Sequence, residues 1–147
     1  MKKIFLTLVL IADFIMCNAQ CYSTHFVDLP NSYLGSYQAP WMNFTGTTSA
    51  TFEMWVKRQY ISSPTTKETI FNKQLCFDLS IIHDTLVGTV GSSSVRYKYP
   101  SDSNWHHVTF IRDRSTGQLR LYIDGLLVQS AIDNSSSVTS PYGITIG

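Results

Sequence analysis

His106 and His107 stand side by side in the segment Trp105–Gly125, and imidazole side chains can bind metal ions or transfer protons. The segment alternates apolar and polar residues, which is the pattern of a β-strand. Successive side chains of a strand point to opposite faces of its sheet, so the two rings cannot bind one metal ion without distorting the backbone. We therefore interpret the two histidines as strand residues and not as a metal or acid–base centre.

Carboxylate side chains are the other groups that could carry out catalysis. Hydrolysis of a glycosidic bond commonly needs two carboxylates a few ångströms apart. Glu53 and Glu68 are the only glutamates and lie 15 positions apart, and Asp78 stands alone between two apolar residues. The sequence also lacks the serine motif of a nucleophile elbow. It thus predicts a protein that is not an enzyme, with Glu53 as a solvated or salt-bridged strand residue.

The first 19 residues have the features of a cleaved secretory signal peptide. Lys2 and Lys3 precede a mostly apolar run, Ile4 to Met16, and Cys17-Asn18-Ala19 supplies small residues at the cleavage position. The run is shorter than the roughly 20 residues that a transmembrane helix needs. We expect a mature chain from Gln20 that is secreted or held at the cell surface without a membrane span. An uncleaved anchor and a lipoprotein signal are the weaker alternatives.

The mature chain of 128 residues carries nine basic and nine acidic side chains. A nucleic-acid site needs a basic face, and Lys57 with Arg58 is too small a cluster to form one. We therefore expect no nucleic-acid partner.

Cys21 and Cys76 are the two cysteines of the mature chain. In an exported protein they could form a disulfide bond. Two separate buried thiols are an equally good interpretation, because the sequence does not give the distance between the two residues. The spacing typical of zinc sites is absent from the sequence.

Short alternating segments follow one another along the mature chain. In Thr51–Lys57, the side chains of Phe52, Met54 and Val56 share one face, which we expect to face the core. The clearest pair of strands, 105–111 and 119–123, is followed by Asp124-Gly125, a dipeptide that favours a tight hairpin turn. Further strands are predicted over 69–72, 75–82, 86–90, 95–99 and 126–129, the second of them with Leu75, Phe77, Leu79 and Ile81 on one face. This series of strands indicates an antiparallel sandwich or barrel.

The motifs TFEMWVKR, IFNK, FDLSI, WHHVTF and LRLYIDGLLV occur in this order along the chain. Together they resemble the LamG-like jelly-roll domains (laminin G-like and pentraxin-like) of the concanavalin A-like lectin/glucanase superfamily, over about Phe26 to Gly147. The resemblance implies an all-β fold, an antiparallel β-sandwich of the jelly-roll type, as a domain over residues 20–147. Family members continue with a further strand, so the resemblance implies a copy truncated at its C-terminus. It also implies that the histidine of its Trp-x-His-Val strand, near Trp105, has a packing or hydrogen-bonding role.

The resembled superfamily includes both lectins and glycan hydrolases, so the fold alone does not give the function. The Glu-x-Asp-x-x-Glu run of its hydrolases is absent from this sequence. We favour a non-catalytic recognition or adhesion module of a larger extracellular protein, with carbohydrate or protein as its partner. The alternatives are an accessory domain or fragment of a glycan-cleaving enzyme, and a structural spacer.

Aromatic residues near loops are the candidate ligand contacts, because aromatic faces and nearby polar groups bind sugars. Trp41 is the first choice, since no strand pattern requires an aromatic residue between Pro40 and Asn43. The other candidates are Tyr37, Tyr97 and Tyr99. By contrast, we expect core or core-edge positions for four aromatic residues of the strands, Trp55, Trp105, Phe110 and Tyr122.

Calcium is a possible cofactor of the resembled superfamily, held by Asp and Asn oxygens. Asp28 and Asn31 are the candidate ligands. Asp102 and Asn104 have the same chemistry, but a turn before a strand explains them equally well, because Asx side chains cap turns.

Overall fold

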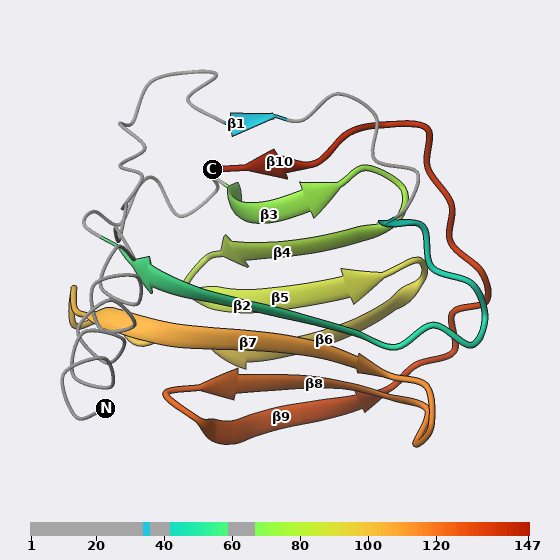
Figure 1. The fold of residues 1–147 in the computed structure, drawn as a ribbon. Helices are drawn as coiled ribbons and strands as arrows, with labels where there is room; N and C mark the ends of the chain where they lie inside the picture. The colour runs from blue at the N-terminus through green and yellow to red at the C-terminus, as the bar shows by residue number, and fades with distance from the viewer. Residues whose placement is uncertain (1–33, 36–41, 59–66) are drawn as a thin grey trace, which may run out of the picture.

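The computed structural model describes residues 34–35, 42–58 and 67–147 (Figure 1). The predicted signal peptide lies outside these residues. So do Cys21, Asp28, Asn31, Tyr37 and Trp41 among the candidate site residues. Within the described residues, no helix is both long and apolar enough to cross a membrane.

The described residues form two antiparallel sheets packed face to face, which confirms the predicted β-sandwich (Figure 1). One sheet has six strands in the order β1-β10-β3-β4-β5-β6, and the other has four in the order β2-β7-β8-β9. The strands are β1 (Leu34–Gly35), β2 (Ala50–Lys57), β3 (Lys67–Lys73), β4 (Phe77–Ile82), β5 (Thr85–Val90), β6 (Ser93–Lys98), β7 (Trp105–Asp113), β8 (Gln118–Ile123), β9 (Leu126–Ile132) and β10 (Thr145–Ile146).

The alternation along β2 sets which of its side chains enter the core. Phe52 is buried, Met54 and Val56 pack against the core, and the intervening side chains are exposed. β2 pairs with β7 along its whole length, with Phe52 opposite Phe110. The predicted inward face of β2 is therefore confirmed.

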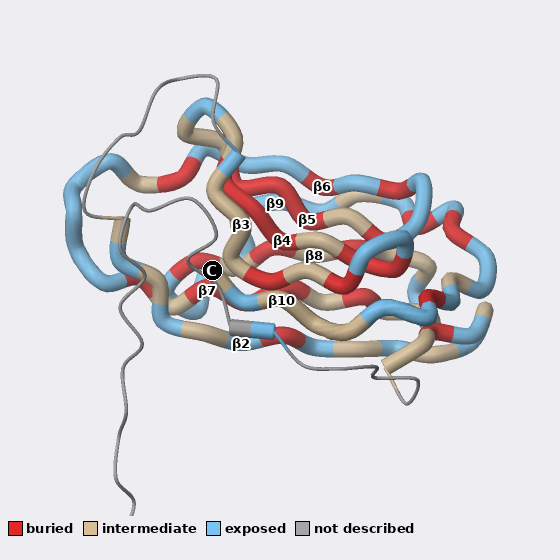
Figure 2. Tube along the Cα trace, turned by 90° about the horizontal axis from the view of Figure 1, so that it is seen from above, coloured by how far each residue is buried: buried red, intermediate tan, exposed pale blue. Residues whose placement is uncertain are grey.

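Five phenylalanines fill the centre of the sandwich, where Figure 2 shows buried positions along the middle strands. The ring of Phe52 lies 4.7 Å from that of Phe77 and 6.2 Å from that of Phe110, measured between centroids. Gly88 on β5 makes room for the Phe110 ring, because a Cβ at this position would lie 2.6 Å from its Cε2 atom. The other two rings belong to Phe44 and Phe71.

Tight turns join neighbouring strands. Asp124 and Gly125 have φ angles of 53° and 78°, as the predicted Asp-Gly hairpin requires. His83 and Asp84 also have positive φ and form the predicted turn between β4 and β5. The prediction for Leu75 is wrong: β4 begins at Phe77, and Leu75 lies in the preceding turn with φ 67° and a 70% exposed side chain.

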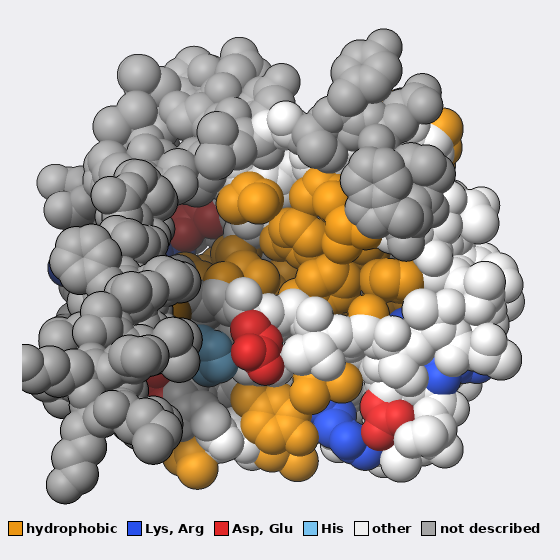
Figure 3. Space-filling model, in the orientation of Figure 1, with side chains coloured by type: hydrophobic (Ala, Val, Ile, Leu, Met, Phe, Trp, Pro, Cys, Tyr) orange, Lys and Arg blue, Asp and Glu red, His pale blue; other side chains and the backbone are white. Residues whose placement is uncertain are grey.

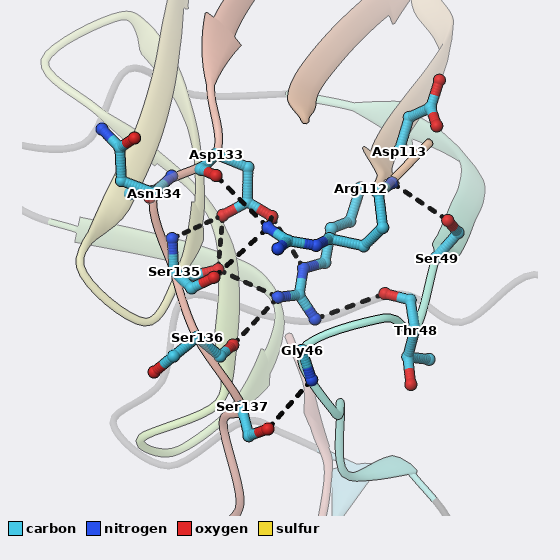
Figure 4. Close-up of polar contacts among 12 residues, drawn as sticks. Gly46, Thr48, Ser49, Arg112, Asp113, Asp133, Asn134, Ser135, Ser136 and Ser137 are labelled. Atoms are coloured by element: carbon cyan, nitrogen blue, oxygen red, sulfur yellow. Dashed lines mark hydrogen bonds and ion pairs between the residues drawn. The ribbon is translucent and has the colours of Figure 1, made fainter. Parts of the chain in front are cut away.

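A buried arginine fastens the loops at one end of the sandwich (Figure 4). Arg112 on β7 donates hydrogen bonds to Asp133 and Ser135, which follow β9, and to the carbonyl oxygens of Thr45 and Thr48, which precede β2. A further bond reaches the Ser136 carbonyl. One guanidinium group thus holds two loops that are far apart in the sequence.

The two sheets come together at β6 and β9. On the other side of the sandwich, between β2 and β10, Figure 3 shows hydrophobic side chains at the bottom of a hollow.

Candidate functional site

Two tryptophans lie on the outer face of the four-stranded sheet. Trp55 of β2 is 65% exposed and Trp105 of β7 is 52% exposed. Their expected place in the core or at its edge is therefore wrong, whereas Phe110 is buried as expected. Trp55 shares its side of β2 with Glu53 and Lys57, and strand alternation turns all three away from the phenylalanine core.

Strand register places the two tryptophans beside a histidine. Trp55 lies opposite His107, and Lys57 lies opposite Trp105. The ring centroids of Trp55 and His107 are 5.3 Å apart, with a tilt of 51°. We call Trp55, Trp105 and His107 the aromatic face. In Figure 3, side chains of the hydrophobic, basic and acidic classes lie next to one another on the front of this sheet.

The aromatic face has the chemistry of a surface that holds a sugar ring. An exposed indole offers an apolar surface, and the neighbouring charged groups can form hydrogen bonds with hydroxyls. Glu53 and Lys57 lie two residues before and two residues after Trp55 along β2, on the same side of the sheet. Apolar and polar groups thus alternate over a short stretch of one sheet.

His106 points inward, next to the aromatic face in sequence but on the opposite side of the sheet. Its Nδ1 lies 2.7 Å from Asp124 Oδ2 and its Nε2 lies 2.9 Å from Asp102 Oδ1. Its ring and the ring of Tyr99 are nearly perpendicular, at 83°, with their centroids 5.7 Å apart. We call Asp102, His106 and Asp124 the histidine clamp. This arrangement gives His106 two hydrogen-bonding partners on the inner side of the sheet.

The hydrogen bonds within the histidine clamp shift the pKa values of its side chains. The hydrogen bonds of Asp102 and then Asp124 raise the pKa of His106 above its ordinary value, although burial acts in the opposite direction. The bond from His106, with a second from the Asn104 N–H, lowers the pKa of Asp102 to about 2. Both shifts favour a charged imidazole between two charged carboxylates.

Tyr97 and Tyr99, predicted as ligand contacts, lie away from the aromatic face. Tyr97 is partly exposed on β6, in the six-stranded sheet. Tyr99 is a core residue with 1% exposure, and its hydroxyl donates a 3.1 Å hydrogen bond to the Val56 carbonyl. Burial raises the pKa of Tyr99 to about 12. A phenol so enclosed has no surface for a ligand, so the structure corrects the expectation for Tyr99.

Of the candidate calcium ligands, only Asp102 and Asn104 fall within the described residues. Asp102 accepts a hydrogen bond from the Asn104 N–H at 3.0 Å, which is the turn-capping alternative. Among the described residues, no three His, Cys, Asp or Glu side chains are grouped as a metal site would need.

The remaining candidate side chains have structural partners. Cys76 is a buried free thiol whose Sγ lies 3.4 Å from the Val138 carbonyl oxygen, while Cys21 lies outside the described residues. Glu68 pairs with Arg58, and Asp78 pairs with Lys67 at 2.8 Å. These two carboxylates are thus neutralised by basic side chains.

Sequence reasoning overlooked the tryptophans of the aromatic face, although a signal for Trp55 was present. The alternation of Thr51–Lys57 already placed Trp55 on the polar side of its strand. The general tendency of aromatic side chains to be buried was given more weight than this local pattern.

Solved structures with a similar fold include toxin binding domains and a putative carbohydrate binding protein. The chain resembles the binding domain of botulinum neurotoxin serotype G, with a TM-score of 0.65 and 20% identity over 79% of this chain and 32% of that one. A putative carbohydrate binding protein from Bacteroides ovatus is similar with a TM-score of 0.64 and 23% identity, over 78% of this chain and 34% of that one. The binding domain of botulinum neurotoxin DC in complex with SialylT is similar with a TM-score of 0.60 and 18% identity, over 84% of this chain and 36% of that one. This chain therefore spans about a third of the length of these proteins.

The search of curated proteins found no match. The family model of the concanavalin A-like lectin/glucanases superfamily matches residues 31–147, which include every strand of the sandwich. The chain belongs to the concanavalin A-like lectin/glucanases superfamily.

Proposed function

We propose that the protein is a non-catalytic recognition module that binds carbohydrate through the aromatic face. The observation that carries this proposal is the exposure of two indoles, Trp55 and Trp105, on one face of one sheet. Clustered exposed apolar side chains rimmed by polar groups are typical of binding sites. The pairing of β2 with β7 places both tryptophans near His107, so the aromatic face is already formed in the unliganded protein.

The kinds of protein that share the fold support a binding role. One structural neighbour is described as a putative carbohydrate binding protein, and another was solved in complex with SialylT. In this chain, Glu68 and Asp78 are engaged by Arg58 and Lys67, which argues against their acting as a catalytic pair. Recognition is therefore better supported than glycan cleavage.

The module acts outside the cell and belongs to a larger exported protein. Residues 1–19 supply the export signal, and the chain corresponds to about a third of each structural neighbour. Detection of the protein in culture medium or on the cell surface, beginning at Gln20, tests the first part. Sequencing the gene beyond the codon for Gly147 tests the second.

A glycan array tests the binding proposal. The exported protein, with the Trp55→Ala and Trp105→Ala variants, is applied to neutral and sialylated glycans, with and without calcium. Each substitution should weaken binding at least about tenfold, as expected for a central aromatic contact. The matched control is Tyr97→Ala, which removes a partly exposed aromatic ring from the other sheet and should leave binding unchanged.

Two results would contradict the proposal. The first is a wild-type protein that binds no glycan under either condition. The second is binding that the tryptophan variants retain in full. Calcium dependence in the wild type would direct attention to Asp28 and Asn31, the calcium ligands expected from the sequence.

A further inference from the structure

The ring of His106 has a carboxylate at each of its two nitrogen atoms. The distances are 2.7 Å from Nδ1 to Asp124 and 2.9 Å from Nε2 to Asp102, both within hydrogen-bond range. A carboxylate can only accept hydrogen bonds, and a neutral imidazole carries one N–H. Only the protonated imidazole can donate to both carboxylates. The neutral ring would turn a lone pair toward one of them.

Asp102 and Asp124 are the charged groups that contact the His106 ring, and the other neighbouring groups are uncharged or paired elsewhere. Tyr99, at the end of β6, meets the ring by its edge and has its hydroxyl bonded to Val56. Val56 of β2 lies opposite His106 and has no charge. Arg58, which follows β2, is held by Glu68 and Asp84.

The same two carboxylates hold the backbone on both sides of Trp105. Asp102 Oδ1 accepts the Asn104 N–H at 3.0 Å, immediately before Trp105. Asp124 Oδ1 accepts the His107 N–H at 2.9 Å, two residues after it. Asp102 therefore connects the His106 ring to the peptide N–H of Asn104, and Asp124 connects it to the peptide N–H of His107.

We propose that His106 is a positioning residue of the aromatic face, whose protonated ring holds Trp105 in place through Asp102 and Asp124. Loss of the proton releases one carboxylate, and the peptide group bonded to that carboxylate loses its anchor. The orientation of Trp105 then changes while Trp55, held in the middle of β2, stays in place. The inference rests on the proposed function only in treating Trp105 as a ligand contact.

The direction of the pH dependence follows from the clamp. The carboxylates favour the charged ring, so His106 keeps its proton to a higher pH than an ordinary histidine. Trp105 is held below this raised pKa and released as the pH increases through it. The aromatic face is thus complete only below this raised pKa.

Nuclear magnetic resonance of the unliganded, isotope-labelled protein tests this inference. The indole N–H signal of Trp105 and the ring signals of His106 are followed together from pH 5 to pH 9. We expect the Trp105 signal to move in one step with the same midpoint as the His106 ring. In His106→Gln the step should disappear at all pH values. In the matched control His107→Gln, which removes the neighbouring imidazole of the aromatic face, it should remain.

A Trp105 signal that does not change with pH, or a step that persists in His106→Gln, would overturn the inference. Should His106→Gln fail to fold, Asp102→Asn supplies the second test, because it removes one of the two charges while keeping a side chain of the same size. In Asp102→Asn, the step in the Trp105 signal should move to lower pH. An unchanged midpoint would also contradict the proposed role of the histidine clamp. Because no glycan is present, failure on the glycan array leaves this measurement unaffected.

Discussion

Arg112 and Asp133 form an ion pair from which solvent is fully excluded. The Arg112 Nε and Asp133 Oδ2 atoms are 2.9 Å apart, and both side chains are 0% exposed. Burial by itself would raise the pKa of Asp133, but the bonds from Arg112 and Ser135 lower this pKa far below its usual value. Two buried charges are tolerated when they satisfy each other, and one left alone is costly.

Asp133→Asn should therefore destabilise the protein strongly. The substitution leaves the Arg112 charge buried without its counter-ion, which costs about 3–5 kcal/mol of unfolding free energy. Urea unfolding followed by tryptophan fluorescence measures the loss. Glu53→Gln, at an exposed position of β2, is the control and should change stability by less than about 0.5 kcal/mol. A loss below about 1 kcal/mol in Asp133→Asn would mean that the pair is dispensable.

The histidine clamp should make stability depend on pH. The pKa of His106 is raised in the folded protein, so its contribution to stability is complete below the unfolded pKa of about 6.5. This contribution is lost as the pH rises through the folded pKa. The difference in unfolding free energy between wild type and His106→Gln should accordingly be larger at pH 5.5 than at pH 9. Taking the difference removes the contributions that the two proteins share, and a difference that grows with pH would refute the assignment.

Gly88→Ala should be destabilising although alanine is suited to an ordinary strand position. The added Cβ would lie 2.6 Å and 2.8 Å from two carbons of the Phe110 ring, so this ring or its surroundings must shift. Overpacking of this kind costs about 1–3 kcal/mol. Thermal unfolding compares it with Gly46→Ala, where the nearest atom would be 3.8 Å away. Equal melting temperatures for the two variants would show that the ring can shift freely.

The fold was predictable because alternation is a local property. β2, β7 and β8 match their predicted ranges closely, and along β2 and β8 more buried residues alternate with less buried ones. The short strands β1 and β10 were not predicted, because two residues cannot show a period. Leu75 was misplaced because its apolar character continued the period of β4, while its positive φ belongs to a turn.

The candidate site was less predictable because it depends on contacts between distant segments. Alternation shows that His106 and His107 point to opposite sides, and it does not show what either meets. Asp102 and Asp124 reach His106 from a loop and a hairpin turn. Tyr99 lies just beyond β6, where the sequence gives no sign that its hydroxyl reaches β2.

The chemistry of Cys76 distinguishes the two interpretations of the cysteines. In the fold this thiol is free and buried, and burial raises its pKa, so little of the reactive thiolate is present. Iodoacetamide should therefore leave Cys76 unmodified in the folded protein and label it after denaturation without reductant, as read by peptide mass mapping. A disulfide with Cys21 would instead block labelling until reductant is added. Exposed surface cysteines label rapidly under native conditions, so fast native labelling would contradict the buried position itself.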